Sequence, residues 1–121
     1  MTRVIIVYRG RWHIDSWRPQ HKVFLFLNDT TEDSGPFEFI LNTNRRGFRL
    51  RKALTPGYFF NFRELFRSGV SRPYQSIDDR KIEALIEEGY RAHPIIVKAG
   101  TVMIANPSYL IHRATPCTRG K

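Results

Sequence analysis

The chain has 121 residues, with 20 lysines and arginines against 11 aspartates and glutamates, which gives a formal net charge of +9. Its hydrophobic fraction of 41% and aromatic fraction of 13% exclude a disordered chain, and its length predicts a single domain over residues 1–121. The lone Cys117 excludes an intramolecular disulfide and a multi-cysteine zinc site. No apolar run is long enough to span a membrane, and Val4–Tyr8 is too short for a secretion signal, so we expect a soluble cytoplasmic protein.

The first third of the chain is predicted to form strands. Residues 3–10 are a β-branched run ended by Gly10, and Val23–Leu27 is a continuous apolar run, which is typical of a buried strand. A turn-rich loop follows over residues 28–36. The next strand is expected to place three alternating side chains on one face: Phe37, Phe39 and Leu41.

The middle of the chain, at about residues 43–91, is predicted to be an insert of helices and loops. Residues 60–69 favour a helix closed by a glycine. Residues 76–91 favour a longer helix, because Ser76 can cap its N-terminus and Gly89 can end it. We expect these helices to pack against the sheet and assign them no chemistry. The second helix has an apolar stripe at helical spacing: Ile82, Leu85 and Ile86.

Strands are predicted again towards the C-terminus. Pro94 is expected to begin a strand that turns at Ala99–Gly100, and Thr101–Ala105 is expected to run back. A second turn at Pro107–Ser108 leads into a strand over Tyr109–Arg113. Short strands separated by Gly and Pro turns, with a helical insert, predict a mainly β fold of the sandwich or jelly-roll kind.

The triplet His13-x-Asp15 is the first candidate for chemistry. Residues two apart in a strand share a face, so both side chains would point into the same cavity. A metal ion needs a third ligand, and His112 is favoured over His21 and His93 because it lies inside an apolar strand, where an imidazole needs a partner.

Two histidines and one carboxylate on one side of Fe(II) leave three positions open, enough for a bidentate co-substrate and O₂. An alternative remains open at this point. His112 could be a hydrogen-bonded core histidine, while Asp15 pairs with Arg11 or Arg18.

Two blocks of the sequence carry a family resemblance. The first is "WHIDSWRPQHKVFLFLNDTTEDSGPFEFI", Trp12–Ile40, in which an H-x-D precedes a strand and an acidic turn that ends in Gly-Pro-Phe. The second is "VKAGTVMIANPSYLIHRATPCTRGK", Val97–Lys121, with a glycine turn, a strand and then "HRATP". Both blocks, in this order and at this separation, resemble the phytanoyl-CoA dioxygenase family. The middle of the chain, residues 43–91, shows little of the resemblance.

The resemblance implies a double-stranded β-helix, which is a cupin-like jelly roll. It also implies Fe(II) as the metal, 2-oxoglutarate as the co-substrate, and O₂ and a small organic molecule as the other substrates. Matched residue by residue, His13 and Asp15 correspond to the proximal metal ligands of the family and His112 to the distal one. His21 and His93 match nothing.

The chain departs from the family at the anchor for the co-substrate. In the family, an arginine on the strand after the distal histidine grips the far carboxylate of 2-oxoglutarate. This chain ends at Lys121, about where that strand should begin, so we expect the last strand of the jelly roll to be missing. Arg113 neighbours His112 and should face away from it. Arg119 and Lys22 are the remaining candidates for the anchor.

A basic segment, Asn44–Lys52, holds five of the twenty basic residues, with Phe48 between them. Arginine interleaved with an aromatic residue is typical of a nucleic-acid patch, because guanidinium groups pair with phosphates and rings stack on bases. An alternative function is therefore a non-catalytic jelly-roll module that binds nucleic acid or another anion. A further alternative is a cupin-like metal-binding protein without 2-oxoglutarate chemistry. We expect four arginines in an exposed loop, outside the iron site: Arg45, Arg46, Arg49 and Arg51.

Overall fold

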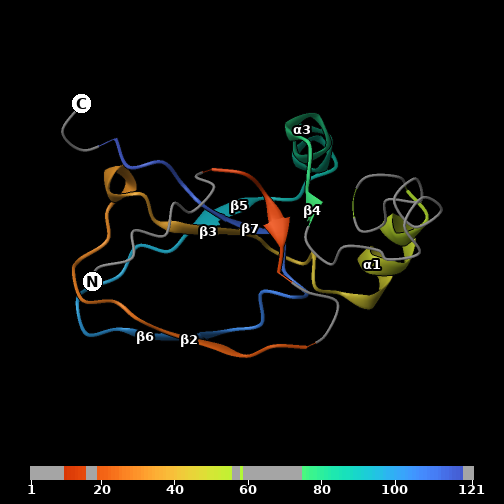
Figure 1. The fold of residues 1–121 in the computed structure, drawn as a ribbon. Coiled ribbons are helices and arrows are strands. Elements are labelled where there is room, and N and C mark those ends of the chain that lie inside the picture. The colour runs from red at the N-terminus through yellow and green to blue at the C-terminus, as the bar shows by residue number, and fades with distance from the viewer. Residues whose placement is uncertain (1–9, 16–18, 56–57, 59–74, 119–121) are drawn as a thin grey trace.

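The computed structural model describes residues 10–15, 19–55, 58 and 75–118. The fold is mainly β, with two antiparallel sheets (Figure 1). Among the described residues, no helix is both long and apolar enough to cross a membrane. The elements in chain order are β1 (His13–Ile14), β2 (Lys22–Leu25), the 3₁₀ turn η1 (Glu32–Ser34), β3 (Phe37–Ile40), α1 (Arg46–Ala53), β4 (Gln75–Ser76), α3 (Asp79–Glu87), β5 (Ala92–Pro94), β6 (Val102–Ala105) and β7 (His112–Ala114).

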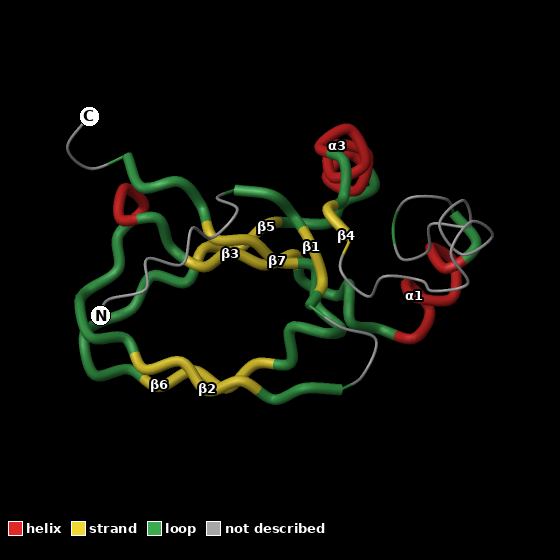
Figure 2. The backbone as a smooth tube through the Cα atoms, in the orientation of Figure 1, coloured by secondary structure: helices red, strands yellow, loops and turns green. Residues whose placement is uncertain are grey.

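The strands form two layers. One sheet has five strands in the order β4-β1-β7-β3-β5, and the other pairs β2 with β6. Figure 2 shows the two sheets facing each other, with α3 on the far side of the five-stranded sheet and α1 beyond its end. Strand β7 is central, and its His112 lies opposite both His13 on β1 and Phe39 on β3. Segments from the two ends of the sequence therefore meet at one point of the sheet.

The hydrophobic core lies between the five-stranded sheet and the helices. Trp12 and Ile14 are buried there, while the alternating residues His13 and Asp15 face the other sheet. The strand period of two thus separates a core face from a polar face on the same strand. The remaining buried apolar residues come from six other segments: Ile40, Phe48, Tyr58, Ile77, Ile82, Leu85 and Ile111.

A buried hydroxyl joins the end of β3 to the segment that enters β7. Thr43 is fully buried, and its Oγ1 donates a hydrogen bond to the carbonyl oxygen of Ile40 at 2.8 Å. The same oxygen accepts the backbone N–H of Ile111 at 3.1 Å. Two backbone groups that the sheet leaves unpaired are satisfied by one side chain, so this contact helps to fix the position of the strand that carries His112.

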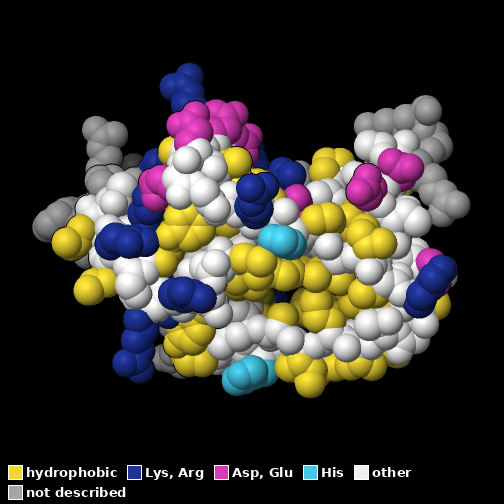
Figure 3. All heavy atoms as spheres, turned by 180° about the vertical axis from the view of Figure 1, so that it is seen from behind, with side chains coloured by type: hydrophobic (Ala, Val, Ile, Leu, Met, Phe, Trp, Pro, Cys, Tyr) yellow, Lys and Arg dark blue, Asp and Glu magenta, His cyan; other side chains and the backbone are white. Residues whose placement is uncertain are grey.

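The prediction of a buried strand over Val23–Leu27 is only partly right. Strand β2 forms, but only Phe24 and Phe26 turn towards the five-stranded sheet and become half-buried. The second sheet has two strands and nothing on its outer side among the described residues, so its outward side chains remain exposed, as along the lower edge of Figure 3. These exposed apolar residues are Val23, Leu25, Leu27, Val102 and Ile104.

The expected insert at residues 43–91 is not made of helices and loops alone, because β4 belongs to the five-stranded sheet and pairs with β1. Ser76 lies in β4, and the cap of α3 is Asp78, whose side chain accepts the N–H of Arg80. Helix α3 ends as expected at Gly89, which has a positive φ of 96°. Ile86 is exposed, so the buried stripe of α3 is narrower than predicted: Ile82 and Leu85.

The basic segment forms α1 rather than an exposed loop. Arg49 is half-buried, and its guanidinium carbon lies 4.0 Å from the centre of the Tyr109 ring. Lys52 forms an ion pair with Glu88 at 2.7 Å. Three arginines of the segment stay exposed: Arg45, Arg46 and Arg51.

Other predicted boundaries also shift. Pro94 ends β5 instead of beginning a strand, and residues 109–110 form a turn, so that β7 begins only at His112. The predicted turns at Gly100 and Pro107–Ser108 and the strand over residues 102–105 are confirmed. The strand predicted over residues 3–10, apart from Gly10, and the helix over residues 60–69 lie outside the described residues.

The substitution Thr43→Val should lower the free energy of unfolding by about 1–3 kcal/mol, because it keeps the shape of the side chain but leaves two buried backbone groups without a partner. The matched control is Thr55→Val, since Thr55 is exposed and its hydroxyl donates a long hydrogen bond to the Arg51 carbonyl at 3.3 Å. That control should change stability by no more than about 0.5 kcal/mol. Denaturant unfolding measures both, and equal changes would refute the bridging role of Thr43.

Candidate metal centre

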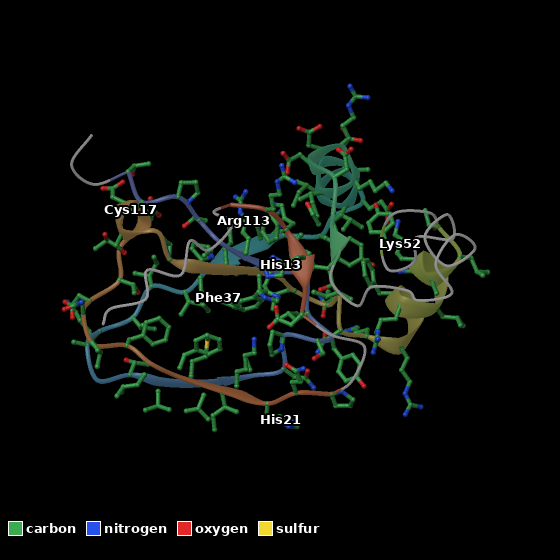
Figure 4. The ribbon with its side chains drawn as sticks, in the orientation of Figure 1. His13, His21, Phe37, Lys52, Arg113 and Cys117 are labelled. Atoms are coloured by element: carbon green, nitrogen blue, oxygen red, sulfur yellow. The ribbon has the colours of Figure 1, made fainter. Side chains whose placement is uncertain are left out.

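Three side chains predicted as metal ligands come together in the gap between the two sheets. His13 and His112 are direct partners on the neighbouring strands β1 and β7, and their ring centres are 4.3 Å apart. Asp15 follows β1 by one residue, and its N–H donates to the Pro107 carbonyl at 3.2 Å. One ligand atom from each of the three side chains lies within 4.8 Å of the other two. Figure 4 shows His13 on the side of the sheet that faces β2 and β6, near Phe37.

Each imidazole is held by a backbone carbonyl two residues before it. His13 Nδ1 lies 2.8 Å from the Arg11 carbonyl oxygen, and His112 Nδ1 lies 2.9 Å from that of Leu110. A carbonyl oxygen only accepts, so each Nδ1 must carry the proton. Nε2, the nitrogen that faces Asp15, therefore carries the proton that hydrogen-bonds to the carboxylate when an imidazole is charged, and the lone pair that can bind a metal ion when it is neutral. Both rings have the tautomer and orientation that a metal ligand needs.

The two Nε2 atoms converge on one carboxylate oxygen. Asp15 Oδ1 lies 3.4 Å from Nε2 of His13 and 3.3 Å from Nε2 of His112. The second oxygen, Oδ2, accepts a hydrogen bond from the ammonium of Lys22, which reaches across from β2. The carboxylate therefore uses one oxygen towards the histidines and the other towards the opposite sheet.

The electrostatics of the cluster favour an ionised Asp15. The imidazoles of His112 and His13 hold the pKa of Asp15 well below its usual range, Lys22 adds to this effect, and burial opposes it. For His13, burial acts to lower the pKa, but the hydrogen bonds to Asp15 and to the Arg11 carbonyl together outweigh it, so the pKa is raised. The site presents a charged carboxylate between two nitrogen ligands, which suits a cation.

An apolar wall and a cavity adjoin the cluster. The ring of Phe37 stacks on His112, with ring centres 5.2 Å apart, and also contacts Phe24 at 5.6 Å. A cavity of about 480 Å³ lies between the sheets, and Phe37 forms part of its wall. Figure 3 shows a recess among hydrophobic side chains between the sheets. The wall also includes Phe39, Ile95, Met103, Tyr109 and Leu110.

The remaining predicted residues fall in different places. Lys22 is at the cluster, but its ammonium pairs with Asp15. Arg113 faces away from the cluster, as expected: it pairs with Glu38 at 2.7 Å, and its guanidinium carbon lies 4.3 Å from the centre of the Trp12 ring. Arg119 lies outside the described residues.

His21 and His93 are not part of the cluster. His21 is exposed before β2 and lies away from His13 (Figure 4). His93 stacks on Phe39, with ring centres 6.1 Å apart. Both positions agree with the preference for His112 as the third member.

Among the described residues, Asp15 pairs with Lys22 and not with Arg11. The Asp15–Arg11 ion pair, which belonged to the alternative in which His112 is only a core histidine, is therefore not formed. Arg18 lies outside the described residues. Sequence reasoning missed the stack of Phe37 on His112 and the two Nδ1–carbonyl bonds. The alternation of Phe37 with Phe39 could have predicted part of this arrangement, because it places both rings on one face of the strand.

Comparison of the chain with protein-family models, with curated proteins and with solved structures finds no match.

Proposed function

We propose that this chain is an Fe(II)- and 2-oxoglutarate-dependent dioxygenase core that hydroxylates a small organic molecule. The observation that carries the proposal is the convergence of two imidazole Nε2 atoms, both with a fixed tautomer, on one oxygen of a charged carboxylate. The resemblance to the phytanoyl-CoA dioxygenase family points in the same direction, since it assigns the same three residues as ligands.

The donor set fits a first-row transition-metal ion. Ligands about 2.1 Å from one ion, at octahedral or tetrahedral angles, lie about 3.0–3.4 Å apart. The two distances from Asp15 Oδ1, 3.3 and 3.4 Å, are close to this range before any adjustment. Two imidazoles and one carboxylate on one side of an ion are the ligands of non-haem Fe(II) oxygenases and leave positions for a co-substrate and O₂. When bound, Fe(II) with 2-oxoglutarate and O₂ supplies the oxidising power.

The other residues of the site have supporting roles. Lys22 holds Oδ2 of Asp15 and so directs Oδ1 towards the two histidines. Phe37 covers one face of His112 and keeps water from that side of the ligand. The cavity of about 480 Å³ is within the size range of small-molecule sites. Because its wall is mainly apolar, we propose a substrate with a hydrophobic body.

The architecture supports the proposal at the level of the fold. A double-stranded β-helix places its metal site between two facing antiparallel sheets, and here the cluster lies between a five-stranded and a two-stranded sheet. We propose that these sheets are the two halves of such a jelly roll.

Two other functions are distinguished by metal content and turnover. A cupin-like metal protein would bind the ion at the same three residues but would not consume 2-oxoglutarate. A non-catalytic binding module would bind neither and would depend on the basic residues around α1. Measurement of bound metal separates the module from the other two, and co-substrate consumption separates those two from each other.

Fe(II), added without oxygen, should raise the melting temperature of the chain. At an ion concentration 100 times the dissociation constant, binding stabilises the folded state by about 2.7 kcal/mol, which shifts the melting temperature of a domain of this size by on the order of 10 °C. Asp15→Ala and His13→Ala should remove this shift, because each deletes a ligand.

The matched control for the metal experiment is His21→Ala, which removes an exposed imidazole outside the cluster and should keep the full shift. Each variant is compared with its own metal-free melting temperature, so that a loss of intrinsic stability is not counted. Co(II) absorption gives a second readout of the ligand set. A full shift in Asp15→Ala would mean that the ion binds elsewhere, and the proposal would fail.

The chain should bind the metal ion but should convert 2-oxoglutarate to succinate only slowly. The ammonium of Lys22 already pairs with Asp15, so in the described part of the chain this predicted anchor is not available to the far carboxylate of 2-oxoglutarate. A charge-assisted bond to that carboxylate contributes roughly 1.5–3 kcal/mol, so co-substrate affinity should be about ten- to a hundredfold below that of a site with a bidentate arginine.

Succinate formation by the metal-loaded chain measures this turnover. Lys22→Met should leave the affinity of the metal-loaded chain for 2-oxoglutarate within about threefold of the original. A larger loss would identify Lys22 as the co-substrate anchor and contradict its assignment to Asp15.

A further inference from the structure

The outward side of the two-stranded sheet carries a row of exposed aliphatic side chains. Strands β2 and β6 pair antiparallel, with Val23 opposite Ile104 and Leu25 opposite Val102. Side chains alternate along a strand, so these four turn away from the five-stranded sheet, and Leu27 continues the row at the same spacing. Each of the five is between 57% and 77% exposed, and the row runs along the lower edge of Figure 3. These five side chains are called the outer face below.

The inward side of the same sheet is already engaged. Phe24 and Phe26 are half-buried towards the five-stranded sheet, and Lys22 forms an ion pair with Asp15 of the proposed metal centre. A sheet of only two short strands is marginally stable in water and is stabilised by an apolar layer packed against it. The outer face is therefore a surface that another apolar layer would stabilise.

The size of the outer face matches a small protein contact. Complete burial of one such aliphatic side chain removes on the order of 100 Å² of apolar surface, so five that are 57–77% exposed present about 300–400 Å². Exposed apolar patches of this size are often functional. Two copies that cover each other would bury about 700 Å² of these side chains. Apolar atoms make up about 60–65% of an interface, so the whole contact would be about 1,100 Å², which is at the lower end for a specific interface.

The charges around the outer face favour a neutral protein surface over an anion. Lys98, at the end of the sheet, pairs with Asp29 at 2.7 Å, and Lys22 is turned inward to Asp15. The exposed arginines of the basic segment belong to α1, which lies beyond the end of the sheets (Figure 2). The described part of the outer face thus offers no free lysine or arginine to a nucleic acid or to anionic lipids. It also places no like charges opposite each other when two copies meet.

We propose that the outer face is the contact between two copies of this chain, with β2 and β6 of one copy stacked on β2 and β6 of the other. The branched side chains of two such sheets interdigitate when the sheets lie about 10 Å apart. Around a two-fold axis, one self-complementary patch serves both partners. The metal centre stays inside each copy, so the proposal does not depend on the proposed function.

Sedimentation velocity at about 0.15 M salt, over a series of protein concentrations, tests the contact. The unchanged chain should form a reversible dimer with a dissociation constant on the order of 10–100 μM, as expected for a small interface. Ile104→Glu should abolish the dimer, because it places two carboxylates in an apolar contact. Ile104→Thr keeps the β-propensity of the strand and should weaken the dimer by about tenfold.

The matched control is Leu50→Glu, which introduces the same charge at a leucine that is 75% exposed on α1, outside the outer face. It should change the dissociation constant by no more than about threefold. Circular dichroism checks that each variant keeps its strands. A dimer that persists in Ile104→Glu, or an equal loss in Leu50→Glu, would overturn the proposal, and so would a chain that stays monomeric up to about 1 mM.

Salt and lipid vesicles distinguish the other occupants of this surface. Two copies carry the same formal net charge of +9, and the contact between them is apolar, so about 0.5 M salt should leave the dimer unchanged or strengthen it. A dimer that weakens with salt would depend on charged groups and contradict the proposal. Binding of phosphatidylcholine vesicles by a monomeric chain, lost in Ile104→Glu, would replace it with a membrane surface.

Discussion

The pairing of His13 with His112 across β1 and β7 is the constraint on which both faces of the five-stranded sheet depend. Because side chains alternate along a strand, this register sends Trp12 and Ile14 to the helices and Asp15 to the opposite side. A slip by one residue would exchange the two sets, placing an imidazole and a carboxylate in the apolar core. The energetics of the core therefore fix the position of the three candidate metal ligands.

The carboxylate of Asp15 connects the two histidines to the opposite sheet. A half-buried charge without partners is unfavourable, and here two imidazoles and an ammonium from the opposite sheet surround it. In the proposed metal-bound state the ion would take the place at Oδ1, while Lys22 keeps Oδ2. Lys22 thus balances the negative charge with or without the ion, and it ties the two-stranded sheet to the five-stranded one.

The cluster could be predicted from the sequence because it depends on local periodicity. His13 and Asp15 are two residues apart in a strand, and His112 lies in an apolar stretch where an imidazole needs a partner. Spacing alone leaves a core histidine as the alternative, and the family resemblance favours the metal ligand. The exposed outer face of β2 could not be predicted, since an apolar run such as Val23–Leu27 contains no sign of which side is covered.

Tertiary contacts account for most of the other differences. Arg49 packs over the ring of Tyr109, sixty residues later in the chain. The charges of the basic segment do not by themselves predict that it forms α1. The observed cap of α3, Asp78, lies two residues after the predicted Ser76. Both are good capping residues, and the pairing of β4 with β1 takes up Ser76. The cavity between the sheets is formed by residues far apart in sequence, which no local pattern reveals.

The two hydrogen bonds from imidazole Nδ1 to the carbonyls of Arg11 and Leu110 have an entropic consequence. A histidine side chain that is free to rotate loses conformational freedom when it binds an ion, and this loss weakens the affinity. In this chain His13 and His112 lose that freedom when the sheet forms, through bonds to backbone carbonyls two residues earlier in the chain. Their ordering is therefore part of the folding free energy, and an arriving ion would meet ligands that need no search among rotamers.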